Sequence, residues 1–190
     1  MISGIWIVLS LTAVAVLVTA IIIYRRRGRA GVDELLRGVA VESMKDILLP
    51  DAMGGQIHLQ HVLLTAKGLL VLDVKTVKGK VFAGDRLDEW TVIDNGQRFT
   101  FQNPQRALYD RVAALKARTR DIPIAGYVLF LAEAEFNEGR PADVIHPDER
   151  RTRYAKPEKA ELERLMEAFY PHWEKVKAGS EPAPRPSSPI

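Results

Sequence analysis

Two neighbouring apolar runs carry the residues whose types and spacing best suit a chemical role. The runs cover residues 57–64 and 69–75, and the short TAKG stretch between them predicts a β-hairpin. A loop that is symmetric about its two central residues sets the pairing of the two strands. One face of the hairpin then gathers four polar side chains, with Gln60 opposite Asp73 and His58 opposite Lys75.

Asp73 and Lys75 are two positions apart, so their side chains point to the same face of the strand. Carboxylate and amide oxygens are ligands for hard divalent cations, and a neighbouring lysine can orient or deprotonate a water molecule. These residues therefore suit metal-assisted phosphodiester hydrolysis, in which Asp73 and Gln60 bind Mg²⁺ or Mn²⁺ and Lys75 acts on the water. The alternative is a solvated ion pair on an edge strand, and the pattern alone leaves both interpretations open.

The element before the hairpin is predicted to be a helix over residues 33–50, with Asp33 as its N-cap and Pro50 as its stop. This helix would carry Glu42 close to the polar face of the hairpin. After the hairpin, a short strand is expected at 80–83. Strands at 89–94 and 97–101 flank Asn95-Gly96, the dipeptide most typical of a two-residue hairpin loop, which pairs Val92 with Phe99 and Trp90 with Phe101.

The rest of the chain predicts a mixed α/β domain over residues 33–178. Its further elements are a helix to about 118 that begins with Asn103 as N-cap and Pro104 in the first turn, and strands at 124–131 and 144–145. A last helix runs from Pro157 to about Tyr170, where Pro171 should kink or end it. The Pro/Ser-rich residues 179–190 contain too few apolar groups to pack, so they are expected to form a disordered tail.

The N-terminal part predicts a single membrane-spanning helix. Residues 5–24 are an uncharged apolar run of twenty residues, enough to cross the hydrocarbon core of a bilayer as a helix. Trp6 and Tyr24 suit the two interfaces, and a basic cluster follows within the linker 25–32: Arg25, Arg26, Arg27 and Arg29. A cleaved signal peptide fits less well, because the charges follow the apolar run instead of preceding it.

The basic cluster also predicts the orientation of the chain. By the positive-inside rule, residues 1–4 lie outside the cell and the domain lies in the cytoplasm, next to membrane lipid as its first partner. Those four arginines exceed the whole net charge of +3, so charge alone does not indicate nucleic-acid binding. The absence of cysteine excludes disulfide scaffolds, zinc ribbons and thiol nucleophiles.

The chain resembles the nuclease-related domain family, NERD, a branch of the PD-(D/E)XK nuclease-like fold. The matching pieces, in order, are Gly38-x-x-x-Glu42, QHVLLTAKGLLVLDVK at 60–75, KGKVFAG at 78–84, Trp90 and FQNP at 101–104. The resemblance implies a restriction-endonuclease-like mixed sheet flanked by helices and a role in DNA processing.

The resemblance also assigns roles to single residues. Asp73 and Lys75 match the acidic residue and the lysine of the (D/E)xK step, and Glu42 matches a glutamate of the first helix. Gln60 stands where the family has an aspartate, which removes one charge from the implied metal site. Ala107 stands where the family has a glutamine, three positions after the Asn-Pro proline.

Three functions remain open at this point. The first is a membrane-tethered protein with a degenerate nuclease site that binds DNA or a protein partner, and the second is a residual metal-dependent nuclease. The third is an adaptor that keeps only the fold. No small-molecule cofactor is expected. Four basic residues are candidates for contacts with nucleic acid: Lys78, Lys80, Arg106 and Arg111. His58 and His61 point to opposite strand faces, which argues against a shared metal ion.

Overall fold

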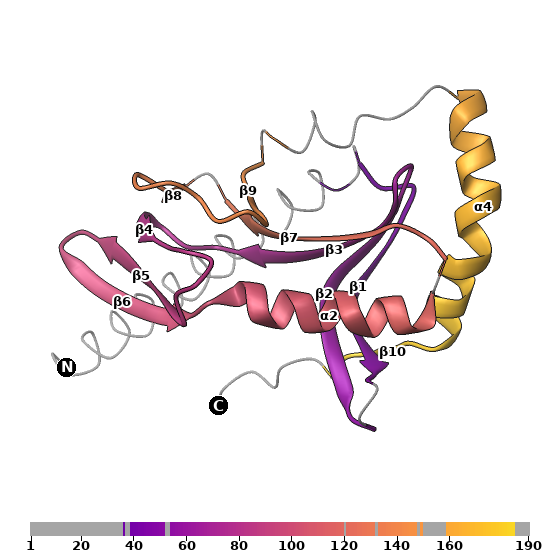
Figure 1. The fold of residues 1–190 in the computed structure, drawn as a ribbon, viewed down its shortest axis with the longest axis horizontal. Helices are drawn as coiled ribbons and strands as arrows, with labels where there is room; N and C mark the ends of the chain where they lie inside the picture. Colours follow the sequence, from indigo (N-terminus) through magenta and orange to yellow (C-terminus); the bar gives the residue numbers. More distant parts are fainter. Residues whose placement is uncertain are drawn as a thin grey trace, which may run out of the picture. The chain divides into compact units, whose positions relative to one another are not determined.

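The structure is a computed structural model that describes residues 36, 39–51, 54–119, 121–131, 133–147, 149 and 159–184. Contacts divide the chain into two compact units, Met1–Arg37 and Gly38–Ile190. Every helix and strand reported below belongs to the second unit (Figure 1).

A six-stranded mixed sheet forms the centre of this unit. Its order is β10 (Glu181–Pro182), β1 (Glu42–Pro50), β2 (Gln56–Thr65), β3 (Gly68–Lys75), β7 (Ile124–Phe130) and β9 (Val144–Ile145). The first four strands are antiparallel, whereas β3, β7 and β9 run parallel. Parallel neighbours need a long crossover, and the one between β3 and β7 contains three strands of a second sheet and a helix.

The predicted hairpin of β2 and β3 is confirmed over its loop end. The paired positions run from Thr65 and Gly68 to His61 and Leu72, which is the register of a symmetric loop. Gly68 has φ +102°, and a Cβ there would lie 2.1 Å from the carbonyl oxygen of Pro123. This turn therefore requires glycine.

The second sheet has the order β6 (Gln97–Gln102), β5 (Glu89–Asp94), β4 (Gly79–Phe82) and β8 (Ala134–Glu135). Asn95 and Gly96 both have positive φ, as a type I′ turn demands, and Val92 pairs with Phe99 as predicted. Trp90 is fully buried between Phe101 and Phe130, with ring centroids 6.0 and 6.1 Å away. Because Phe130 belongs to β7, these rings join the two sheets.

Helix α2 (Pro104–Arg118) lies against the six-stranded sheet (Figure 1). Asn103 caps it as predicted, since its side-chain oxygen accepts a hydrogen bond of 2.9 Å from the Gln105 amide. Leu108 and Leu115 are fully buried on the face toward the sheet. At Gly126 of β7 the missing side chain makes room for Val112 and Leu108 of the helix.

The predicted helix over residues 33–50 is wrong from Glu42 onward, because Glu42–Pro50 forms strand β1. The apolar spacing of Met44, Ile47 and Leu48 fits a helix as well as a strand. Pairing with β2 on one side and β10 on the other decides the outcome, and it buries Ile47 and Leu49 on one face. Glu42 therefore lies on a strand and not on a first helix.

Helix α4 (Lys159–Ala178) continues through Pro171, so of the two predicted effects of this proline, a kink or an end at about Tyr170, the end is wrong. Proline inside a helix costs about 3 kcal/mol. Trp173 and Val176, both fully buried in the core beyond the proline, offset that cost. The predicted start at Pro157 lies outside the described residues.

The expected disorder of the tail is wrong for Glu181–Pro182, which pair with Leu48 and Ile47 of β1. Residues 185–190 lie outside the described part of the chain. The predicted membrane helix at 5–24 also lies outside it. Within the described residues, no helix combines the length and the apolar character that a membrane crossing needs.

The close approach of α2 to β7 generates a stability prediction. In Gly126→Ala the new Cβ would lie 2.6 Å from Val112 Cγ2 and 3.1 Å from Leu108 Cδ1, so these side chains or the helix that carries them must shift. We expect a loss of about 1–3 kcal/mol in the free energy of unfolding, measured by urea denaturation.

The matched control is Gly84→Ala, whose Cβ meets only the half-exposed side chain of Leu87, at 3.3 Å. This variant should unfold close to the wild-type midpoint. Equal stability of the two variants would contradict the packing of α2 against β7.

Candidate functional site

The candidate site lies where strands β2 and β3 separate. Their pairing ends at His61 and Leu72; from there β3 continues beside β7 as far as Lys75, and β2 continues beside β1. The predicted opposition of Gln60 and Asp73 falls just beyond the last paired residues. Gln60 bridges the split with its side chain, because its Oε1 accepts a hydrogen bond of 2.6 Å from the Val74 amide.

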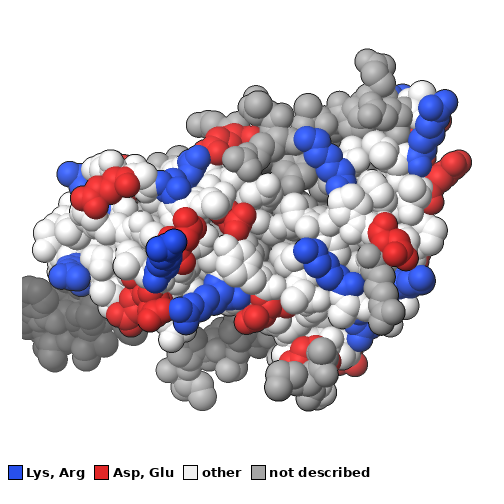
Figure 2. All heavy atoms as spheres, viewed as in Figure 1, with Lys and Arg blue, Asp and Glu red and all other residues white. Residues whose placement is uncertain are grey.

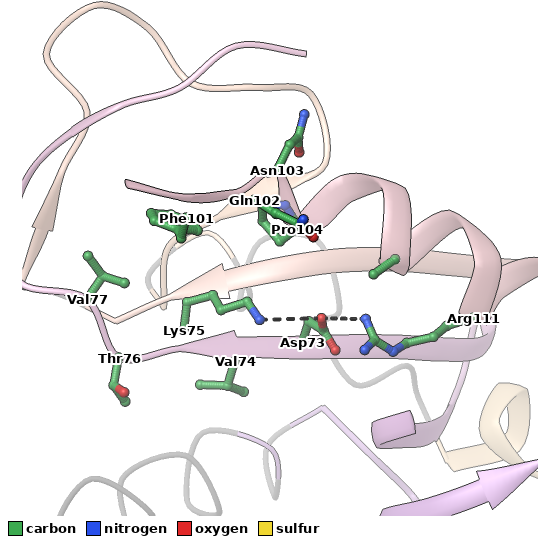
Figure 3. Close-up of a pocket in the computed structure, with 11 residues that line it drawn as sticks. Asp73, Val74, Lys75, Thr76, Val77, Phe101, Gln102, Asn103, Pro104 and Arg111 are labelled. Carbon is green, nitrogen blue, oxygen red and sulfur yellow. Dashed lines mark hydrogen bonds and ion pairs between the residues drawn. The ribbon is translucent and has the colours of Figure 1, made fainter. Parts of the chain in front are cut away.

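Asp73 is the central residue of the site, and its side chain is only 4% exposed. Its Oδ2 lies 2.7 Å from Nη1 of Arg111 and 3.7 Å from Nζ of Lys75 (Figure 3). Arg111 comes from α2, and its Nε also donates a hydrogen bond of 2.6 Å to the carbonyl oxygen of His58. One guanidinium therefore joins α2 to both separated strands.

His58 does not join this cluster through its side chain. The predicted pairing with Lys75 is not formed, since His58 pairs with Leu48 of β1. Its imidazole lies 3.3 Å from the carboxylate of Asp46. The separation of β2 from β3 is the physical reason, because it carries His58 away from the end of β3.

A cavity of about 560 Å³ opens beside Asp73 and Lys75. Residues of the β6–α2 connection line its other side (Figure 3): Phe101, Gln102, Asn103, Pro104 and Ala107. Ala107 occupies the position expected to hold a glutamine, so the cavity lacks a polar side chain there. The sequence pointed to the FQNP stretch without showing that it faces Asp73 across a cavity.

The charges of the site do not fit a Mg²⁺ or Mn²⁺ ion. Asp73 supplies one negative charge, and the cations of Arg111 and Lys75 already neutralise it. The Gln60 oxygen, the other predicted ligand, is used by the Val74 amide. In the described part of the chain, no group of three or more acidic or histidine residues could hold a metal ion.

Glu42 is not part of the site either. It pairs with Leu64 on β2, four residues along the strand from Gln60, or roughly 13 Å. Its carboxylate accepts hydrogen bonds from Trp173 Nε1 at 2.6 Å and from Tyr170 Oη at 3.0 Å. The bond from Trp173, with those from Tyr170 and Lys177, holds the pKa of Glu42 below its ordinary value. Glu42 thus fixes α4 to β1.

Of the predicted nucleic-acid contacts, Lys78 and Lys80 are exposed. Arg106 is exposed but paired with Asp88, and Arg111 is engaged by Asp73. Lysine, arginine and acidic side chains are interspersed on the face shown in Figure 2. The described residues therefore form no broad basic patch on this face.

A second polar cluster lies at Gln105 and Tyr109, outside the cavity lining. The Tyr109 hydroxyl donates a hydrogen bond of 2.7 Å to Asp143, which raises the pKa of Tyr109 to about 12, with burial adding to the effect. Gln105 Nε2 donates to Asp85 at 2.7 Å. These bonds connect the first two turns of α2 to two loops and so hold the cavity wall in place.

The contacts of Glu42 give a prediction for stability. In Glu42→Ala the indole N–H of the buried Trp173 loses its acceptor, which should cost about 1–3 kcal/mol in the free energy of unfolding at neutral pH. Because the folded-state pKa of Glu42 is lowered, the charge contributes stability above its ordinary value of 4.5 and loses it as the pH falls further.

Urea unfolding of both proteins at neutral pH and below pH 4 tests this expectation. Glu174→Ala is the control, since Glu174 pairs only with Lys177 on the same helix, and it should change stability by less than about 0.5 kcal/mol. A Glu42→Ala variant as stable as this control would contradict a structural role for Glu42.

One of three comparisons with known proteins gives a match. The family model of the nuclease-related domain, NERD, matches residues 27–131, more than half of the chain and all of the cavity lining. No curated protein and no solved structure matches the sequence. The mixed α/β architecture is consistent with the nuclease-like fold of this family. The chain belongs to the NERD nuclease-related domain family.

Proposed function

We propose that this protein is a membrane-tethered NERD protein with a degenerate nuclease site, which binds nucleic acid without cleaving it. The observation that carries the proposal is the contact of 2.7 Å between Arg111 and Asp73. The guanidinium of Arg111 occupies the side of the Asp73 carboxylate that a catalytic metal ion would have to bind, and Asp73 is the only acidic one among the described residues that line the cavity.

The charge of the cavity supports binding of a phosphate. Two cations and one carboxylate leave a net charge of +1 among Asp73, Lys75 and Arg111. Lys75 is the more accessible cation, with 34% of its side chain exposed against 18% for Arg111. A phosphodiester placed in the cavity can therefore meet the Lys75 ammonium directly, with Arg111 behind it.

The tether is the second part of the proposal, and the sequence supports it. The apolar run 5–24, followed by four arginines, is typical of a single span whose basic end stays in the cytoplasm. The nucleic acid would then be bound at the inner membrane surface, where the arginines also meet anionic lipid.

A residual metal-dependent nuclease is the second candidate. The specific observation in its favour is that Lys75 Nζ lies 3.7 Å from Asp73, the arrangement that an active (D/E)xK step needs. The two candidates differ in what happens at Asp73, because cleavage requires a metal ion to displace Arg111. An adaptor that keeps only the fold would show neither cleavage nor binding.

The binding proposal makes a prediction for the full-length protein in a mild detergent. Fluorescence anisotropy should show binding to labelled DNA that weakens as salt rises from 50 to 200 mM, because phosphate contacts release counterions. Plasmid incubated with the same protein and Mg²⁺ or Mn²⁺ should stay intact. Lys75→Met should lower the affinity by about tenfold, the loss expected for one charged hydrogen bond.

Lys159→Met is the control, since Lys159 is an exposed lysine at the start of α4 and outside the cavity lining. Its affinity for DNA should equal that of the wild type. If the protein nicks plasmid only with Mg²⁺ or Mn²⁺, and Asp73→Ala abolishes the nicking, the residual nuclease is the correct function. If the protein neither nicks plasmid nor binds DNA, the adaptor function remains.

A further inference from the structure

One wall of the cavity is aromatic. Phe101 lies across from Lys75, so a ring and an ammonium face the same space (Figure 3). Trp90 packs edge-to-face against Phe101 at 6.0 Å and is itself fully buried. The Phe101 ring is therefore held in place from behind, while it stays partly exposed toward the cavity.

A second ring extends this wall beyond the cavity. Phe99 precedes Phe101 by two residues on β6, so both side chains project from the same strand face, roughly 7 Å apart. Phe99 is 53% exposed, the largest exposed fraction among the large apolar side chains of the described residues. Its cross-strand partner Val92 is buried, so only the aromatic member of this pair faces solvent.

The combination of rings and cations selects a class of ligand. Flat aromatic faces bind unpaired bases by stacking, and a neighbouring cation binds the phosphate that links them. In a duplex each base face is already stacked on its neighbour, so the phenylalanine rings could not stack on it. Two rings in a row next to Lys75, with Lys78 exposed on the β3–β4 loop, match the repeating base and phosphate of one strand.

We infer that the cavity and β6 bind single-stranded nucleic acid, with bases stacked on Phe99 and Phe101 and a phosphate at Lys75. This inference rests on the proposed function and adds a strand preference and two specificity-determining residues to it. The extra observation that carries it is the exposed ring of Phe99 beside the lined cavity.

The test compares two labelled ligands of equal length, oligo(dT) and the duplex of oligo(dT) with oligo(dA), bound to the full-length protein in detergent. Wild type should bind the single strand about tenfold more tightly than the duplex. Phe99→Leu should weaken single-strand binding about 5-fold or more, since stacking is lost while an apolar side chain remains. Phe99→Trp should keep the wild-type affinity.

Ile93→Ala is the matched control. Ile93 is an exposed apolar residue of the same hairpin, but its cross-strand partner is Arg98, so it lies on the opposite sheet face from Phe99. Its affinity for oligo(dT) should not change. Equal binding of both ligands, or a Phe99→Leu variant that binds oligo(dT) like the wild type, would overturn the inference and leave the proposed function standing. Failure of the wild type to bind either ligand would overturn both.

Discussion

The buried ion pair of Asp73 and Arg111 is the interaction on which the site depends. Asp73 is almost wholly removed from water, and a buried carboxylate without a partner is strongly destabilising. Arg111 neutralises it from α2 and also binds the His58 carbonyl on the separated strand β2. Removing one partner of such a pair typically costs about 3–5 kcal/mol, so the position of α2 over the split is tied to this charge.

The same pair links the fold to the chemistry of the cavity. The strands separate at Gln60, and its side chain satisfies the freed Val74 amide. An aspartate there would bring a second negative charge next to Asp73, as a divalent cation requires. With glutamine at this position, the guanidinium of Arg111 balances the charge of Asp73. The glutamine at position 60 and the contact of Arg111 with Asp73 together leave Lys75 as the more accessible cation of the cavity.

Local patterns predicted much of this structure. The Asn95-Gly96 turn and the loop between β2 and β3 predicted two strand registers correctly, and the Asn103-Pro104 pair predicted the start of α2, because each depends on neighbouring residues. The strand at Glu42–Pro50 and the continuation of α4 past Pro171 depend on distant partners, which spacing alone does not reveal. Local spacing likewise placed Asp73 beside Lys75, whose charged groups lie 3.7 Å apart. It also placed Glu42 beside them, and it did not reveal that Arg111 binds Asp73.

The most direct test of the central claim is a calorimetric titration of Mn²⁺ into the wild type and into the double variant Gln60→Asp/Arg111→Gln. The account predicts no saturable binding by the wild type and a new site in the double variant, where two carboxylates have lost their internal cation. Arg106→Gln, on the same helix but paired with Asp88, should behave like the wild type. Saturable binding by the wild type that disappears in Asp73→Ala would contradict the claim that Arg111 has taken the place of the metal.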